Sequence, residues 1–166
     1  VYLKYLVDAG AKNIVLLCRK NCGPAVREAI ELYKEKGVTV EVVFADVCNK
    51  EMLAEKLAKV QQKLPVIKGV IHAAGIIKDG MIEDLDWDAF ESVLLPKVAG
   101  SMNLVSVLKE NALDFFIMIS SITSILGNIG QSNYAAANYF MNSLAAYLWQ
   151  NNIPGYVFCW GPWAGK

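Results

Sequence analysis

The segment Phe115-Phe-Ile-Met-Ile-Ser120 is followed, after a connecting stretch, by the alanine-rich segment Ser132–Gln150. The first segment is apolar at consecutive positions, which is typical of a strand buried on both faces of a parallel sheet. The second has the length and composition of a helix and ends before Pro154. A strand followed by a helix is the repeating unit of an α/β fold.

The same alternation continues in both directions along the chain. Val26, Ile30 and Tyr33 follow one another at helical spacing, and Gly37 is placed to end that helix. Pro96 is expected in the first turn of a later helix. In full, we expect strands at Asn13–Cys18, Thr39–Ala45, Ile67–His72, Phe115–Ser120 and Tyr156–Trp160, and helices at Pro24–Lys36, Lys50–Lys63, Pro96–Glu110 and Ser132–Gln150.

This order predicts one domain over residues 1–166, built as an open, doubly wound parallel sheet with helices on both faces. The 166 residues, 55% of them hydrophobic, suffice for a single sizeable core. In such sheets, ligands bind at the carboxyl ends of the strands. We therefore expect the functional residues in the loops that follow the strands.

Charge and hydropathy argue against two classes of partner. Sixteen Lys and Arg residues balance sixteen Asp and Glu residues, so no basic surface for nucleic acid is expected. The longest apolar runs are far shorter than the roughly 18 residues that a membrane-spanning helix needs. The chain starts at Val1 without a secretory signal, which suggests a piece excised from a longer protein.

The cysteine and histidine content argues against a metal site. The four cysteines form no Cys-x-x-Cys pair, and His72 is the single histidine. We therefore expect no metal, reduced thiols and a cytoplasmic location. We expect His72 to be structural rather than catalytic.

The most informative polar residues follow the strand that ends at Ser120. Tyr134 and Asn138 are four residues apart and therefore share one face of the expected helix. Ser121 stands where the preceding strand opens into a loop. A tyrosine and a serine so placed can converge on one oxygen atom of a substrate.

Seven strings of the chain, in this order, resemble those of one superfamily. The chain resembles the short-chain dehydrogenase/reductases, most closely the ketoreductase domains of polyketide synthases and related fatty acid synthases. The resemblance implies a Rossmann-like fold that here lacks the first strand, its glycine-rich turn and the C-terminal lid. The strings are Asn13-Ile-Val-Leu-Leu-Cys-Arg19, Phe44-Ala-Asp-Val47, Gly69-Val-Ile-His-Ala-Ala-Gly75, Leu95-Pro-Lys-Val-Ala-Gly-Ser-Met-Asn-Leu104, Ser120-Ser121, Gly130-Gln-Ser-Asn-Tyr-Ala-Ala-Ala-Asn138 and Trp160-Gly-Pro-Trp163.

The resemblance implies roles for four catalytic residues. Tyr134 matches the acid that protonates the substrate carbonyl oxygen, and Ser121 matches the residue that hydrogen-bonds that oxygen. A free phenol has a pKa near 10, so the tyrosine needs a cation beside it. Stand-alone reductases place a lysine four residues after the tyrosine. Here Asn138 occupies that position and Lys97 matches the lysine, the exchange that is typical of synthase ketoreductases.

The resemblance also implies a nicotinamide cofactor. Arg19 stands where an acidic residue would accept the ribose hydroxyl of NAD, and an arginine there suits the 2′-phosphate of NADPH. Asp46 matches a residue that contacts adenine. The loop Ala73-Ala74-Gly75 matches the loop beside the adenosine ribose, and Pro162 and Trp163 match the loop at the nicotinamide carboxamide. The expected cofactor-binding residues are Arg19, Asp46, Val47, Ala73, Ala74, Gly75, Lys97, Tyr134, Pro162 and Trp163.

The implied reaction is reduction, by NADPH, of a 3-ketoacyl thioester carried on the phosphopantetheine arm of an acyl carrier protein, beside other synthase domains. Ketoreductases that give one alcohol configuration carry Leu-Asp-Asp shortly after the Ala-Ala-Gly loop, and Asp79 matches the second of these aspartates. Those that give the opposite configuration carry a tryptophan where this chain has Leu126. The resemblance therefore favours a D-configured 3-hydroxy product.

Two alternatives stay open. One is a stand-alone short-chain dehydrogenase, and the other is a catalytically silent structural domain. Without the glycine-rich turn, residues 1–166 alone are not expected to bind NADPH tightly.

Overall fold

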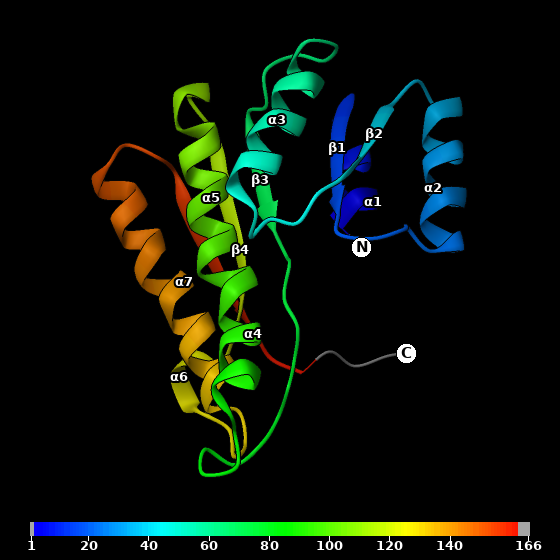
Figure 1. The fold of residues 1–166 in the computed structure, drawn as a ribbon. Helices are drawn as coiled ribbons and strands as arrows, with labels where there is room; N and C mark the ends of the chain where they lie inside the picture. Colours follow the sequence, from blue (N-terminus) through cyan, green and yellow to red (C-terminus); the bar gives the residue numbers. More distant parts are fainter. Residues whose placement is uncertain (1, 163–166) are drawn as a thin grey trace. The chain divides into compact units, whose positions relative to one another are not determined.

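A computed structural model describes residues 2–162 of the chain (Figure 1). They form two compact units, which meet in sequence between Val66 and Ile67. In chain order the elements are α1 (Tyr2–Asp8), β1 (Asn13–Cys18), α2 (Pro24–Glu35), β2 (Thr39–Phe44), α3 (Lys50–Gln61), β3 (Gly69–His72), α4 (Trp87–Lys97), α5 (Ala99–Leu108), the 3-10 turn η1 (Lys109–Asn111), β4 (Phe115–Ser121), α6 (Thr123–Leu126), α7 (Ser132–Gln150) and β5 (Gly155–Trp160).

The first unit is a two-stranded parallel sheet with helices on both faces. β1 and β2 pair from Asn13 opposite Thr39 to Cys18 opposite Phe44. Because neighbouring residues of a strand point to opposite faces, the two strands contribute to two separate clusters. One cluster joins the sheet to α1 and α2, through Ile14, Tyr33, Val38, Leu3 and Leu6. The other joins it to α3, through Val43, Ala45, Val60, Val15 and Leu17.

The second unit is a three-stranded parallel sheet in the order β3-β4-β5. α7 packs on β4 and β5, and α4 packs on α7. Phe116 and Met118 of β4 and Met141 of α7 are fully buried between these layers. Every strand pair of the described residues is parallel, as the continuous apolar runs predict. The α/β fold class is therefore confirmed.

The helix expected at Pro96–Glu110 is the one element that was placed wrongly. The chain forms two helices here, α4 and α5, which meet at Val98. Pro96 lies in the last turn of α4, not in the first turn of its successor. Because proline has no N–H group and crowds the carbonyl of the preceding turn, the helix ends directly after it. Val98 closes α4 through its N–H bond to Leu94 O at 2.8 Å.

The other boundaries agree with the sequence to within two residues. Gly37 ends the region of α2 with a φ of +74°, a backbone conformation that side chains disfavour. β4 runs one residue further than expected, so Ser121 is its last residue. The structure divides the chain into two compact units, and the single domain over residues 1–166 stays a prediction.

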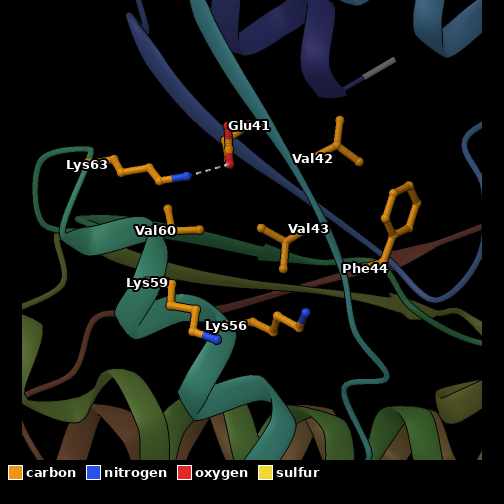
Figure 2. Close-up of a pocket in the computed structure, with 8 residues that line it drawn as sticks. All are labelled: Glu41, Val42, Val43, Phe44, Lys56, Lys59, Val60 and Lys63. Atoms are coloured by element: carbon orange, nitrogen blue, oxygen red, sulfur yellow. Dashed lines mark ion pairs between the residues drawn. The ribbon is translucent and has the colours of Figure 1, made fainter.

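A small hollow of about 250 Å³ lies in the first unit between β2 and α3 (Figure 2). Lys56, Lys59 and Lys63 are among its lining residues, and Lys63 Nζ lies 4.0 Å from the carboxylate of Glu41. None of the residues expected to catalyse or to bind a cofactor lines this hollow. Among the described residues, no helix is both long and apolar enough to span a bilayer, and no group of three potential metal ligands is present.

Candidate active site

A larger cavity, of about 680 Å³, opens in the second unit at the carboxyl ends of its strands. This is the edge at which open parallel sheets bind ligands. It is formed by the loop after β3, the end of β4 with the segment that follows, the start of α7 and the end of β5. The lining residues are Ala73, Gly75, Ile76, Ile77, Lys97, Ile119, Ser120, Ser121, Ile122, Thr123, Leu126, Gly127, Asn128, Gln131, Tyr134, Trp160, Gly161 and Pro162.

Tyr134 reaches this cavity from the first turn of α7. The fully buried Asn133 beside it fixes that turn, because its Oδ1 accepts a hydrogen bond from the N–H of Tyr134 at 2.7 Å. The same side chain donates from Nδ2 to Lys78 O at 2.9 Å. The loop after β3 is thereby tied to the start of α7. This arrangement holds the phenol ring at a defined place in the cavity wall.

Lys97 is a buried cation beside Tyr134. The residue is 4% exposed, its Nζ donates to Ile119 O at 3.1 Å, and Nζ lies 5.6 Å from the centre of the Tyr134 ring. Burial lowers the pKa of Lys97 to about 8, because desolvation disfavours the charged form. At neutral pH the ammonium form still predominates. A positive charge is therefore held against the phenol.

Gly75 leaves room for the lysine stem. A Cβ atom on Gly75 would lie 3.0 Å from Lys97 Cε, closer than nearly all real contacts. A side chain at this position of the Ala73-Ala74-Gly75 loop would therefore crowd the end of the Lys97 stem, which would have to shift.

Ser121 also lines the cavity, at the end of β4, where it pairs with Trp160 of β5. Its Oγ lies 2.9 Å from Thr123 Oγ1 and accepts a hydrogen bond from the N–H of Thr123 at 3.2 Å. Its neighbour Ser120 donates to Asn142 Oδ1 at 2.8 Å instead. Of the two serines in this string, Ser121 is thus the one whose hydroxyl is held beside Thr123 and not bonded to α7.

Asn138 lies deeper than Tyr134 on the same helix. It is fully buried, and its Nδ2 donates to the backbone oxygen of Tyr134 at 2.7 Å. Its Oδ1 has no hydrogen-bond partner among the described residues. Asn138 therefore supports the turn that carries Tyr134, and its side chain does not line the cavity.

The cofactor residues expected after β1 and β2 lie in the first unit. Arg19 is exposed directly after β1, and Asp46 follows β2. Because Cys18 pairs with Phe44 in a parallel sheet, Arg19 and Asp46 stand at the same, carboxyl edge. Asp46 Oδ1 accepts a hydrogen bond from the N–H of Cys48 at 2.9 Å, so it also shapes its own turn. Val47 is half-buried in that turn.

The cofactor residues expected after β3 and β5 meet at the larger cavity. Ala73, Gly75 and Pro162 line it, whereas Ala74 does not. Trp163 lies outside the described residues. The second unit thus gathers Tyr134, Ser121 and Lys97 with three of the expected cofactor contacts.

The bonds that join two loops beside the cavity were not predicted from the sequence. Gln131 donates from Nε2 to both carboxylate oxygens of Asp79, at 3.0 and 3.1 Å, and the N–H of Gly80 donates to Gly130 O at 2.8 Å. These bonds join two loops that are about fifty residues apart in the chain. Their position after β3 and β4 was the available signal, since loops after strands build such sites. Leu126 and Ile77 add exposed apolar side chains to the wall.

Comparisons with known proteins agree with this geometry. The family model described as "KR domain" matches residues 1–165. The chain is 43% identical over 155 residues to the hybrid PKS-NRPS synthetase poxE of Penicillium oxalicum, covering 92% of this chain and 4% of that protein. It is 38% identical over 156 residues to polyketide synthase 19 of Gibberella fujikuroi, covering 93% of this chain and 6% of that protein.

Solved structures give the same result. A ketoreductase domain from the bacillaene assembly line matches with a TM-score of 0.89 and 31% identity, over 98% of this chain and 40% of that chain. An N-terminal ketoreductase from the macrolactin assembly line matches with a TM-score of 0.91 and 28% identity, over 98% and 34%. An A-type ketoreductase of a modular polyketide synthase matches with a TM-score of 0.90 and 28% identity, over 97% and 34%.

These matches confirm the resemblance drawn from the sequence strings, and the structural neighbours confirm the Rossmann-like fold. The chain spans a small part of the synthases it matches, so the comparisons concern a domain and not a whole synthase. The chain belongs to the KR domain family, the ketoreductase domains of polyketide synthases, which are nicotinamide-dependent oxidoreductases.

Proposed function

We propose that this chain carries the site at which NADPH reduces a carrier-bound 3-ketoacyl thioester to the 3-hydroxyacyl thioester. The observation that supports this most strongly is the grouping of a phenol, a hydroxyl and a buried ammonium in one cavity. Tyr134 and Ser121 line its walls, and the Nζ of Lys97 lies 5.6 Å from the tyrosine ring. These are the groups that a carbonyl needs when it gains hydride at carbon and a proton at oxygen.

Each of the three residues has a separate task. Ser121 donates a hydrogen bond to the substrate carbonyl oxygen and holds it beside Tyr134. Tyr134 then gives its proton to that oxygen as negative charge develops there. The Lys97 ammonium stabilises the phenolate that remains, because its charge is held in a buried, weakly screened place. Asn138 supports the turn that carries Tyr134.

The cavity has the size and lining that a nicotinamide ring and a substrate require. Its volume lies within the range of about 300–1,000 Å³ that is typical of small-molecule sites. Ala73, Gly75 and Gly161 bring backbone edges to its wall with little side-chain bulk. The bound cofactor supplies the hydride. Pro162 and Trp163 would hold its nicotinamide carboxamide, and Arg19, Asp46 and Val47, with the loop Ala73-Ala74-Gly75, its adenosine half.

Arg19 is the residue expected to select NADPH over NADH. Arg19→Ala should raise the KM for NADPH about 10- to 100-fold, which corresponds to the loss of a charge-assisted bond to the 2′-phosphate. The KM for NADH should change little. Steady-state kinetics with both cofactors measures this, with Lys20→Ala as the exposed neighbouring control. Equal effects on the two cofactors would mean that Arg19 does not contact a 2′-phosphate.

The apolar part of the cavity wall suits an acyl chain. Ile77, Leu126 and Trp160 are 63%, 77% and 44% exposed, and they line the cavity together. Aliphatic substrates bury such surfaces favourably. The relatives are polyketide synthases and hybrid synthetases, so we propose an acyl carrier protein and further synthase domains as partners, in the cytoplasm.

We propose a D-configured hydroxyl product. Asp79 accepts two hydrogen bonds from Gln131, which lines the cavity, and thereby joins the loop after β3 to the segment before α7. Asp79→Ala should lower the ratio of D to L product about tenfold, the worth of one lost bond to a charged group. Chiral chromatography of the product measures the ratio, and Asp84→Ala in the same loop is the control. An unchanged ratio would remove Asp79 from stereocontrol.

An absorbance assay with a 3-ketoacyl thioester tests the function against its alternatives. We expect the full-length protein to oxidise NADPH with carrier-bound substrate. Turnover of free sugars or steroids in preference to the thioester would favour a stand-alone dehydrogenase. No turnover with any carbonyl substrate would mean a silent structural domain.

A further inference from the structure

The break between α4 and α5 leaves carbonyl groups that side chains satisfy. Pro96 and Lys97 are the last residues of α4, and Val98 separates them from α5. Ser101 Oγ donates to Lys97 O at 2.5 Å. The Pro96 carbonyl lies 2.9 Å from Nε2 of His72. Two side chains therefore hold the backbone where the lysine of the site is attached.

His72 is suited to a fixed, uncharged donor role. It is 3% exposed, and burial lowers its pKa to about 4, helped by the charge of Lys97 and opposed by the Pro96 bond. The ring is therefore neutral at pH 7. Because a carbonyl oxygen only accepts, the proton of the neutral ring lies on Nε2 and is donated to Pro96 O.

The position of His72 in the sheet makes this bond a rigid one. His72 is the last residue of β3 and pairs with Met118 of β4, which is fully buried. The lysine is thus held at two points. Its main chain is attached to β3 through Pro96 and His72, and its Nζ is attached to β4 through Ile119 O. Tyr134 is the titratable side chain that the described contacts place against the ammonium.

We infer that His72 is a positioning residue for the reduction, acting through Lys97: its hydrogen bond to Pro96 O sets where the ammonium stands relative to Tyr134. The expected effect on kcat rests on the proposed function. The expected effect on the position and the pKa of Lys97 does not. Small displacements of groups around a reacting centre are costly, so the loss of one supporting bond affects the rate and not only the stability.

One pair of variants at His72 separates positioning from simple packing. His72→Gln keeps an N–H donor near the place of Nε2, whereas His72→Leu fills the space without a donor. In the full-length protein, His72→Leu should lower kcat about tenfold, with KM values unchanged, and His72→Gln should recover most of the rate. If His72→Leu does not fold, His72→Asn replaces it, because its shorter amide stops short of Pro96 O.

A double-mutant cycle tests whether the effect passes through the lysine. On the Lys97→Met background, His72→Leu should have no further effect on kcat, because the group it positions is already gone. If the double variant lost kcat by the product of the two single-variant factors, the inference would be overturned. It would also be overturned by equal losses of kcat in His72→Leu and His72→Gln, or by a loss of stability in His72→Leu with kcat unchanged.

A measurement without turnover keeps this inference distinct from the proposed function. NMR of lysine labelled at Cε follows the titration of Lys97 in the wild type and in both variants. We expect the pKa of Lys97 to stay near 8 in His72→Gln and to rise in His72→Leu as the released ammonium gains solvent. If the pKa of Lys97 follows this pattern but the wild type reduces no ketoacyl substrate, the proposed function is contradicted and the positioning role is not. Reduction with an unmoved Lys97 in His72→Leu contradicts the positioning role alone.

Discussion

Tyr134→Phe should lower kcat for ketoacyl reduction about 10²- to 10⁴-fold, the usual contribution of a positioned general acid. The substitution removes one oxygen atom from a ring that Asn133 and the first turn of α7 hold in the cavity wall. The KM for NADPH should stay close to that of the wild type. Steady-state rates over a range of cofactor concentrations separate the two constants.

Tyr139→Phe is the matched control for this result. Tyr139 is on the same helix, 61% exposed, and does not line the cavity. Its substitution should leave kcat unchanged. A Tyr134→Phe protein with wild-type kcat would show that the proton comes from another group. In that case the hydroxyl of Ser121 would be the next donor to test.

Lys97→Met should lower kcat about 10²- to 10³-fold, as is typical when a preorganised electrostatic group is removed. Methionine keeps nearly the length and the apolar character of the lysine stem, so it fits the space beside Gly75. The ammonium beside the Tyr134 ring is lost, together with its hydrogen bond to Ile119 O. The phenolate formed on proton transfer is then without the counter-charge that Lys97 supplies.

The pH dependence distinguishes this role from a structural one. Burial lowers the pKa of Lys97 to about 8, so the ammonium is present below that pH and is lost above it. Wild-type kcat should therefore fall as the pH rises through about 8, and this fall should be absent from Lys97→Met. Lys109→Met, on an exposed side chain of η1, should keep the wild-type profile. An alkaline fall that survives in Lys97→Met would assign it to another group.

Local sequence patterns predict most of the fold because buried parallel strands carry a strong signal. Continuous apolar runs mark β1 and β4, and Gly37 ends the region of α2 as expected. Pro96 misled the prediction because proline fits both the first turn of a helix and a turn that is about to end. Asp86, whose side chain accepts a hydrogen bond from the N–H of Ala89, was the signal that α4 starts earlier.

The sequence predicts residues of the candidate site but not the contacts that support them. Tyr134 and Ser121 can be chosen from the sequence because a helix start and a strand end place them at one edge of the sheet. Bonds between distant segments leave no local pattern. The bond from His72 to Pro96 O and the pair of Gln131 with Asp79 become visible only once the strands have brought their loops together.

Transfer of label from cofactor to product tests the central proposal most directly. The full-length protein is supplied with a carrier-bound 3-ketoacyl thioester and with NADPH deuterated at the hydrogen that is transferred, and the product is examined by mass spectrometry. The account predicts a 3-hydroxyacyl thioester with one deuterium at the carbinol carbon, and almost none of this product from Tyr134→Phe. Hydroxyacyl product without deuterium, or labelled product formed equally by Tyr134→Phe, would contradict it.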